Sequence, residues 1–92
     1  MSMPVLANSA WRLRGSVELR PEPFGALAYD FATRRLTFLK TPQLVDVVRG
    51  LAEAPDAAAA ITAAGVPDEQ APAYLAALGN LAEGGLIEER AA

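Results

Sequence analysis

Few residues of this chain are of a type that carries catalysis or holds a metal. The 92 residues include no cysteine and no histidine, which removes disulfides, thiolate ligands, cysteine nucleophiles and the usual imidazole base. Glu22 and Asp30 stand alone, and a single acid near a turn is usually a turn former or a solvated surface residue. Gly84-Gly85 follows a helical pattern and does not precede one, unlike a phosphate-binding loop. We therefore expect no enzyme activity, no metal and no cofactor.

The chemistry that remains is main-chain hydrogen bonding at the edge of a sheet. Residues 24–39 alternate with period two, which is typical of a β-hairpin with one buried face. The connection, about Asp30 to Arg34, predicts a loop of four or five residues. The large apolar members of the alternation are Leu27, Tyr29, Leu36 and Phe38.

An open strand edge can accept an extended peptide as one more strand. If residues 35–39 form the outermost strand, their N–H and C=O groups are available, and a proline at Thr37 is expected to remove a donor. The third helix would form the other wall, where small residues permit close approach: Ala73, Ala76, Ala77, Gly79 and Asn80. For Leu75 and Leu78, plain core packing is the alternative. Arg34 and Arg35 are either partners for acidic ligand side chains or solvated residues of the hairpin tip.

These residues must be positioned by a small α+β fold. A strand near 16–20, ended by Pro21 and Pro23, precedes the hairpin, so that three short antiparallel strands result. Gly25 lets the chain re-aim into the hairpin. Trp11 covers one end of the core, and residues 1–10 are expected to form a loose arm.

Everything after Lys40 predicts helix. Thr41-Pro42 is typical of a helix start, and this helix is expected to end near Ala54. Asp56 caps a second helix over 57–64, and a third begins around Gln70 and ends at Gly84. Three strands with three helices are the outline of a small winged helix-turn-helix in a single domain, 1–92, whose core depends on a short list of large residues.

Charge separates the two halves of the chain. Residues 1–40 carry six basic and three acidic side chains, whereas residues 41–92 carry two basic and eight acidic ones. Duplex DNA is held mainly through its phosphates by basic side chains, yet no Lys or Arg lies between Asp68 and Gly84. This composition argues against a DNA-binding helix. The N-terminus lacks the pattern of a signal peptide and no apolar run is long enough to cross a bilayer, so we expect a cytoplasmic protein.

The central block resembles the mycofactocin-system peptide chaperones (MftB), relatives of the PqqD-like RiPP recognition elements. The resemblance rests on Trp11-x-Leu13, on Val17-x-Leu19 continuing through Arg20-Pro21-Glu22-Pro23-Phe24-Gly25-Ala26-Leu27-Ala28-Tyr29, and on Thr33-Arg34-Arg35-Leu36-Thr37-Phe38-Leu39-Lys40. It continues more loosely through the helices to Gly85-Leu86-Ile87 and covers most of the chain.

This resemblance implies a three-stranded winged-helix domain that binds the leader of a ribosomally made precursor peptide. The leader would add as a strand beside the third strand, against the third helix, and would be presented to a radical S-adenosylmethionine (SAM) enzyme that carries the iron–sulfur cluster and SAM. The implied binding residues are Arg35, Leu36, Thr37, Phe38, Leu39 and Lys40, with Tyr74, Leu75 and Leu78. Arg34 is added to these candidates only as a possible partner for acidic ligand side chains. A DNA-binding winged helix and a purely structural subunit of the modifying enzyme remain the alternatives, and a homodimer is possible through the open edge.

Overall fold

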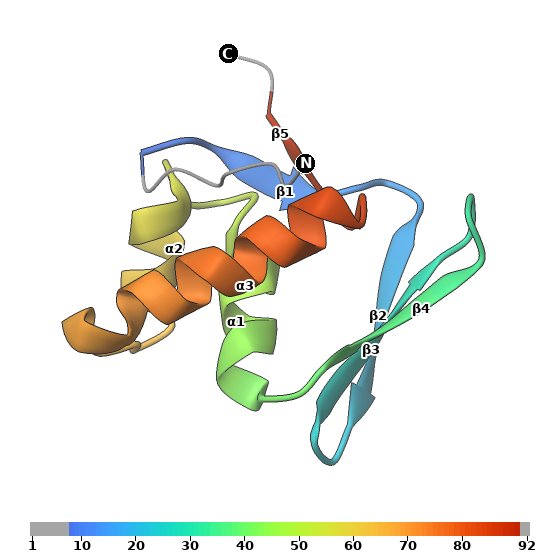
Figure 1. Ribbon diagram of the computed structural model, residues 1–92, viewed down its shortest axis with the longest axis horizontal. Helices are drawn as coiled ribbons and strands as arrows, with labels where there is room; N and C mark the ends of the chain where they lie inside the picture. The colour runs from blue at the N-terminus through green and yellow to red at the C-terminus, as the bar shows by residue number, and fades with distance from the viewer. Residues whose placement is uncertain (1–7, 91–92) are drawn as a thin grey trace.

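The computed structural model describes residues 8–90, which form five strands, three α-helices and one 3-10 turn (Figure 1). In chain order these are β1 (Trp11–Leu13), β2 (Val17–Glu22), β3 (Gly25–Asp30), β4 (Arg35–Leu39), α1 (Pro42–Gly50), α2 (Ala57–Ala63), η1 (Asp68–Gln70), α3 (Ala71–Glu83) and β5 (Ile87–Glu89). The α+β class is confirmed.

The main sheet is antiparallel, with the strand order β2-β3-β4. The predicted hairpin is confirmed as β3 and β4, joined by a four-residue loop over 31–34. Gly25 has a φ of 155°, and a Cβ at this position would lie 2.2 Å from the carbonyl oxygen of Leu39, so only glycine fits there. The prediction that Pro21 ends the first strand is wrong, because β2 continues to Glu22 and Pro21 pairs with Ala26. An edge strand tolerates this proline since its missing N–H faces away from the ladder.

A second sheet, which the sequence analysis did not predict, joins the two ends of the described chain. β1 pairs antiparallel with β5, so that Trp11 lies opposite Glu89 and Leu13 opposite Ile87. The described part of the predicted N-terminal arm is anchored beside it: the Ser9 carbonyl accepts from the Ala57 N–H, and the Ala10 carbonyl from the Arg90 N–H. Residues 1–7 of that arm lie outside the described residues.

The helices follow their predicted caps. The Thr41 hydroxyl accepts from the Leu44 N–H and the Asp56 carboxylate from the Ala59 N–H, as helix N-caps do. The first helix, however, ends at Gly50 and not near Ala54. The stretch after Gly50 is turn, and the Arg90 guanidinium donates to the carbonyls of Ala52 and Ala54 there.

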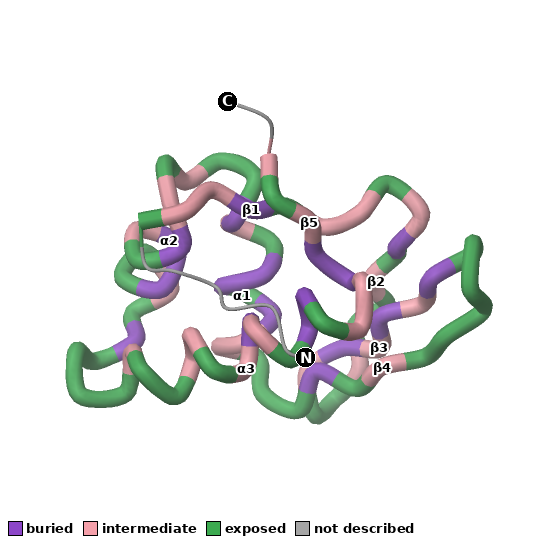
Figure 2. Tube along the Cα trace, turned by 45° about the horizontal axis from the view of Figure 1, so that its top comes forward, coloured by how far each residue is buried: buried purple, intermediate pink, exposed green. Residues whose placement is uncertain are grey.

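The core lies between the helices, the two-stranded sheet and one face of the main sheet (Figure 2). On β3 that inner face carries Ala26, Ala28 and Asp30, all buried. The expectation that large residues build the core holds for the helices and for Leu39 of β4, but it fails for β3, where small alanines face the core. Leu36 and Phe38 lie on the outer face, 59% and 58% exposed.

Candidate peptide-binding site

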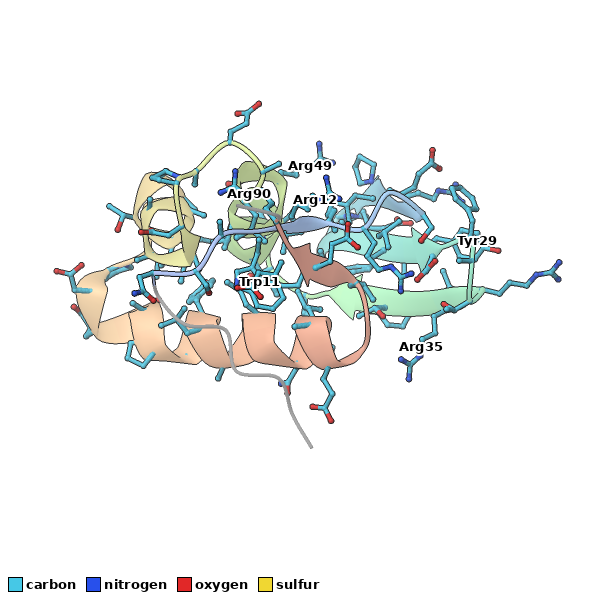
Figure 3. All side chains as sticks on the ribbon, turned by 90° about the horizontal axis from the view of Figure 1, so that it is seen from above. Trp11, Arg12, Tyr29, Arg35, Arg49 and Arg90 are labelled. Carbon is cyan, nitrogen blue, oxygen red and sulfur yellow. The ribbon has the colours of Figure 1, made fainter. Side chains whose placement is uncertain are left out.

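β4 is an edge strand. Within residues 8–90 it pairs only with β3, and no described strand covers its other side. In Figure 3 the three strands lie side by side, with β4 nearest to α3 and β2 farthest from it. The uncovered edge of the sheet therefore lies on the same side of the molecule as α3.

Ladder geometry identifies the main-chain groups of β4 that point outward. The Phe31 N–H donates to the Ser16 carbonyl in the register of the β2–β3 pair. In an antiparallel sheet the residues of a central strand bond alternately to the strands on either side, so Tyr29 and Leu27 bond to β2. Ala28 consequently bonds to β4, where it lies opposite Thr37.

The same alternation runs along β4. Arg35, Thr37 and Leu39 direct their main-chain groups to β3, and Leu36 and Phe38 direct theirs to the open edge. The prediction that proline at Thr37 removes an edge donor is therefore wrong: Thr37 holds β4 to the sheet. The donors and acceptors offered to a further strand belong to Leu36 and Phe38.

The second wall is α3, linked to β4 by Arg35. The Arg35 guanidinium donates to the carbonyl of Gly84, the C-cap of α3, at 3.3 Å. In Figure 3 its side chain leaves β4 on the α3 side. A cation at a helix C-terminus also opposes the partial negative charge of the helix dipole. Arg35 thus spans the end of the space between edge and helix.

A small hollow lies farther along the same side, between α1 and α3. Its volume is about 160 Å³, and it is lined by Thr41, Leu44, Ala73, Tyr74 and Ala77. The Tyr74 hydroxyl is oriented by Gln43, to whose side-chain carbonyl it donates at 3.2 Å. Small alanines on α3 leave the hollow open, and Leu44 and the Tyr74 ring make it apolar. Thr41 and Leu44 were not among the predicted site residues, because their cap and stripe positions indicate only helix structure.

The ten predicted site residues divide into three groups. Arg34, Leu36, Phe38 and Lys40 are exposed, and Arg35 is exposed while bonded to α3. Thr37, Tyr74 and Leu75 are half-buried. Leu39 and Leu78 are fully buried in the core. Their side chains therefore support the site through core packing and are not exposed to a peptide.

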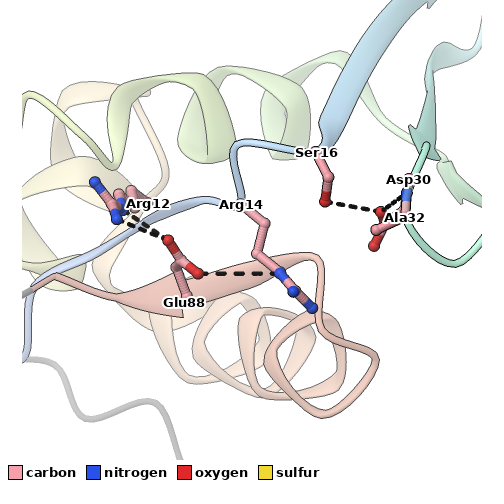
Figure 4. A network of polar contacts seen from close by, with 6 residues as sticks. All are labelled: Arg12, Arg14, Ser16, Asp30, Ala32 and Glu88. Carbon is pink, nitrogen blue, oxygen red and sulfur yellow. Dashed lines mark hydrogen bonds and ion pairs between the residues drawn. The ribbon is translucent and has the colours of Figure 1, made fainter.

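The buried carboxylate of Asp30 is hydrogen-bonded within the hairpin region. Its carboxylate accepts from the Ser16 hydroxyl at 2.8 Å and from the Ala32 N–H at 2.9 Å (Figure 4). The Ser16 hydroxyl lowers the pKa of this carboxyl below its ordinary value; burial opposes the shift, and donors of Ala32 and Thr33 favour it. Arg12 and Arg14, at 2.8 and 4.0 Å from the Glu88 carboxylate, belong to the separate β1–β5 contact. Asp30 therefore closes the hairpin loop, as expected of a single acid near a turn.

The sequence of this chain is similar to those of known peptide chaperones. The chain is 53% identical over 78 residues to a peptide chaperone MftB of Mycolicibacterium smegmatis, covering 85% of this chain and 76% of that protein. It is 48% identical over 83 residues to a peptide chaperone MftB of Mycobacterium tuberculosis, covering 90% and 76%. No solved structure matches. The relatives place this chain among peptide chaperones, a non-catalytic class. The peptide chaperone MftB family model matches residues 10–88, and the chain belongs to that family.

None of the helices within residues 8–90 has both the length and the hydrophobicity that a membrane span requires.

Proposed function

We propose that this chaperone binds the leader of a ribosomally synthesised precursor peptide as a fourth strand on β4, and presents it to a radical SAM maturase in mycofactocin biosynthesis. The observation that carries the proposal is the outward direction of the Leu36 and Phe38 main-chain groups on an uncovered edge beside α3. Strand addition takes its affinity from such groups and its specificity from pockets for alternate side chains.

The two sides of a docked strand would meet different surroundings. Side chains next to Leu36 and Phe38 would lie on the outer face of the sheet, and the alternate ones would face Thr37, α3 and the hollow beside Tyr74. That hollow suits one apolar leader side chain. Arg34 and Lys40 are exposed at the two ends of β4 and would attract acidic leader residues. The third helix has no basic side chain and could not supply this attraction.

Presentation requires nothing catalytic from this chain. The iron–sulfur cluster and SAM would belong to the maturase. A disordered leader loses conformational entropy on docking. Once it is held, its encounter with the enzyme becomes effectively intramolecular if the chaperone also binds the enzyme. That increase in effective concentration is the benefit a small peptide-binding domain provides.

The test is a matched pair of substitutions at one position. Phe38→Pro removes the outward N–H of Phe38, whereas Phe38→Ala removes the side chain and keeps the N–H. Titration calorimetry with the precursor peptide is expected to show binding lost or at least about tenfold weaker for proline, and only moderately weaker for alanine. Backbone-amide NMR of each variant confirms that the fold is intact.

Two outcomes contradict the proposal. Equal affinities of the proline and alanine variants would remove the β4 edge as the site. No measurable affinity of the wild-type chain for the peptide, together with tight co-purification with the maturase, would favour a purely structural subunit.

A further inference from the structure

The outer face of the main sheet is apolar and has no partner within the described chain. All four large hydrophobic residues that the described chain exposes lie there: Phe24, Phe31, Leu36 and Phe38. The rings contact one another in pairs, Phe24 with Phe38 at 5.9 Å between centroids and Tyr29 with Phe31 at 5.0 Å. Clustered apolar exposure of this kind on a small protein marks an interaction surface.

The face is hollowed in two places. The larger hollow, about 440 Å³, is lined by Glu18, Arg20, Leu27, Tyr29, Phe31 and Leu36. The second, about 350 Å³, is lined by Phe24, Phe38 and Lys40. Neither lies on the inner side of β4 where α3 stands, so the proposed peptide site leaves this face uncovered.

The charges on this face are arranged at its two margins. β2 contributes Glu18, Arg20 and Glu22, whereas the β4 margin has only cations, Arg34 at one end and Lys40 at the other. Glu22 pairs with Gly25, and the β3–β4 register, continued by one residue beyond Leu39, places Lys40 on the other side of Gly25. Glu22 and Lys40 thus end one transverse row of the sheet, two strand spacings or about 10 Å apart.

We propose that the outer face binds the same face of a second copy, with the two-fold axis parallel to the strands. Such a rotation places β2 of each copy opposite β4 of its partner and keeps each residue in its row. Glu22 then faces Lys40 of the partner subunit, and Arg20, which shares a row with Leu27 and Phe38, faces the partner's Phe38. Each contact occurs twice, as an isologous interface requires.

Two kinds of contact in this arrangement are chemically complementary. Opposite charges meet at both margins, and an arginine opposite an aromatic ring gives a cation–π contact. The apolar residues between the margins become the centre of a six-stranded sandwich. Both β4 edges stay open, so the dimer would carry two peptide sites. The dimer does not depend on the peptide-binding proposal, and its test uses no peptide.

The experiment is sedimentation equilibrium of the full chain over a concentration series, with a charge swap. The wild type is expected to change from monomer to dimer as its concentration rises. Glu22→Lys and Lys40→Glu are each expected to weaken dimerisation about tenfold or more through like-charge contacts, and the double substitution to restore it. Glu69→Lys, an exposed substitution on η1 with the same change in net charge, is the matched control and is expected to dimerise like the wild type.

A second variant tests the apolar centre without the charges. Leu27→Lys places a charge on the central strand β3, where the rotation brings Leu27 opposite the partner's Leu27, and is expected to abolish the dimer, while circular dichroism shows the fold unchanged. A chain that stays monomeric at every concentration would overturn the proposal, as would a dimer that tolerates both single charge reversals. A monomer whose outer-face variants lose only maturase binding would assign this face to the enzyme.

Discussion

The two edges of the three-stranded sheet differ in the hydrogen-bond donors that they leave free. On β2 the outward-facing residues are Val17, Leu19 and Pro21. The Val17 N–H already donates to the Arg14 carbonyl, and proline has no N–H. Leu19 is therefore the one residue of β2 with a free outward N–H. On β4 both Leu36 and Phe38 keep an N–H that makes no bond within the described residues. The β2 edge therefore keeps one free donor, whereas the β4 edge keeps two.

This difference shows how one short sheet can limit strand pairing at one edge while the other edge keeps more free donors. Prolines on an edge strand are a common protection against edge-to-edge association. Here the edge strand far from α3 contains one proline, Pro21, and the edge next to α3 has none between Arg35 and Lys40. A strand that added to β2 would also lack the hollow beside Tyr74.

The largest effect is expected from proline on the bonded side of β4. Thr37→Pro removes an N–H that bonds to β3 and leaves the carbonyl of Ala28 without its donor, whereas Phe38→Pro removes only an outward N–H. We expect Thr37→Pro to lower the free energy of unfolding by about 2–4 kcal/mol and Phe38→Pro by less than about 1 kcal/mol. Urea denaturation followed by circular dichroism measures both. Equal losses would mean that the alternation along β4 is assigned incorrectly.

Local sequence signals predicted the parts of the fold that depend on neighbours. The helix caps at Thr41 and Asp56, the hairpin and its loop length follow from residues a few positions apart, and the structure confirms them. The β1–β5 sheet could not be predicted in this way, because it joins strands of three residues from opposite ends of the chain. Strands that short show too little alternation to be recognised.

The sequence did not predict which face of the hairpin is buried. Alternation shows that two faces differ but does not say which face is buried. Leu27 and Tyr29 form the larger apolar set, yet the sheet packs on its alanine face, where α1 lies against β3. The direction of the Thr37 N–H likewise depends on the ladder phase, which side-chain pattern alone does not fix. The edge position of β4 was predicted from the sequence. Which of its N–H groups point outward could be identified only from the structure.

A smaller effect, on peptide affinity, is expected when a proline is placed on the β4 edge as it is on the β2 edge. Leu36→Pro leaves one outward donor in place of two, as on β2, and we expect about a tenfold loss of peptide affinity relative to Leu36→Ala. Calorimetric titration with the precursor peptide measures the difference. Both variants lack the leucine side chain, so any change in the outer face is common to them. Indistinguishable affinities would mean that the edge donors do not bind the peptide.

Asp30 holds both edges at the same end of the sheet, since its carboxylate joins Ser16 before β2 to the loop before β4. Its lowered pKa means that its stabilising contribution is complete above its ordinary value of 3.8 and is lost as the pH falls through the lower folded value. Asp30→Asn is therefore expected to lower the thermal midpoint at pH 7. The difference from wild type should shrink below about pH 4. A difference that stays constant from pH 7 to pH 3 would contradict this role of the carboxylate.

The smallest effect is expected from opening the protected edge. Pro21→Thr gives β2 a second outward N–H and makes its edge chemically similar to that of β4. If donors alone defined a peptide site, this variant would bind a second peptide. We expect a stoichiometry of one per chain and an affinity within about twofold of wild type, because specificity in strand addition also needs side-chain pockets, and β2 has neither α3 nor the hollow beside Tyr74. Calorimetry gives both values, and a stoichiometry of two would show that donors suffice.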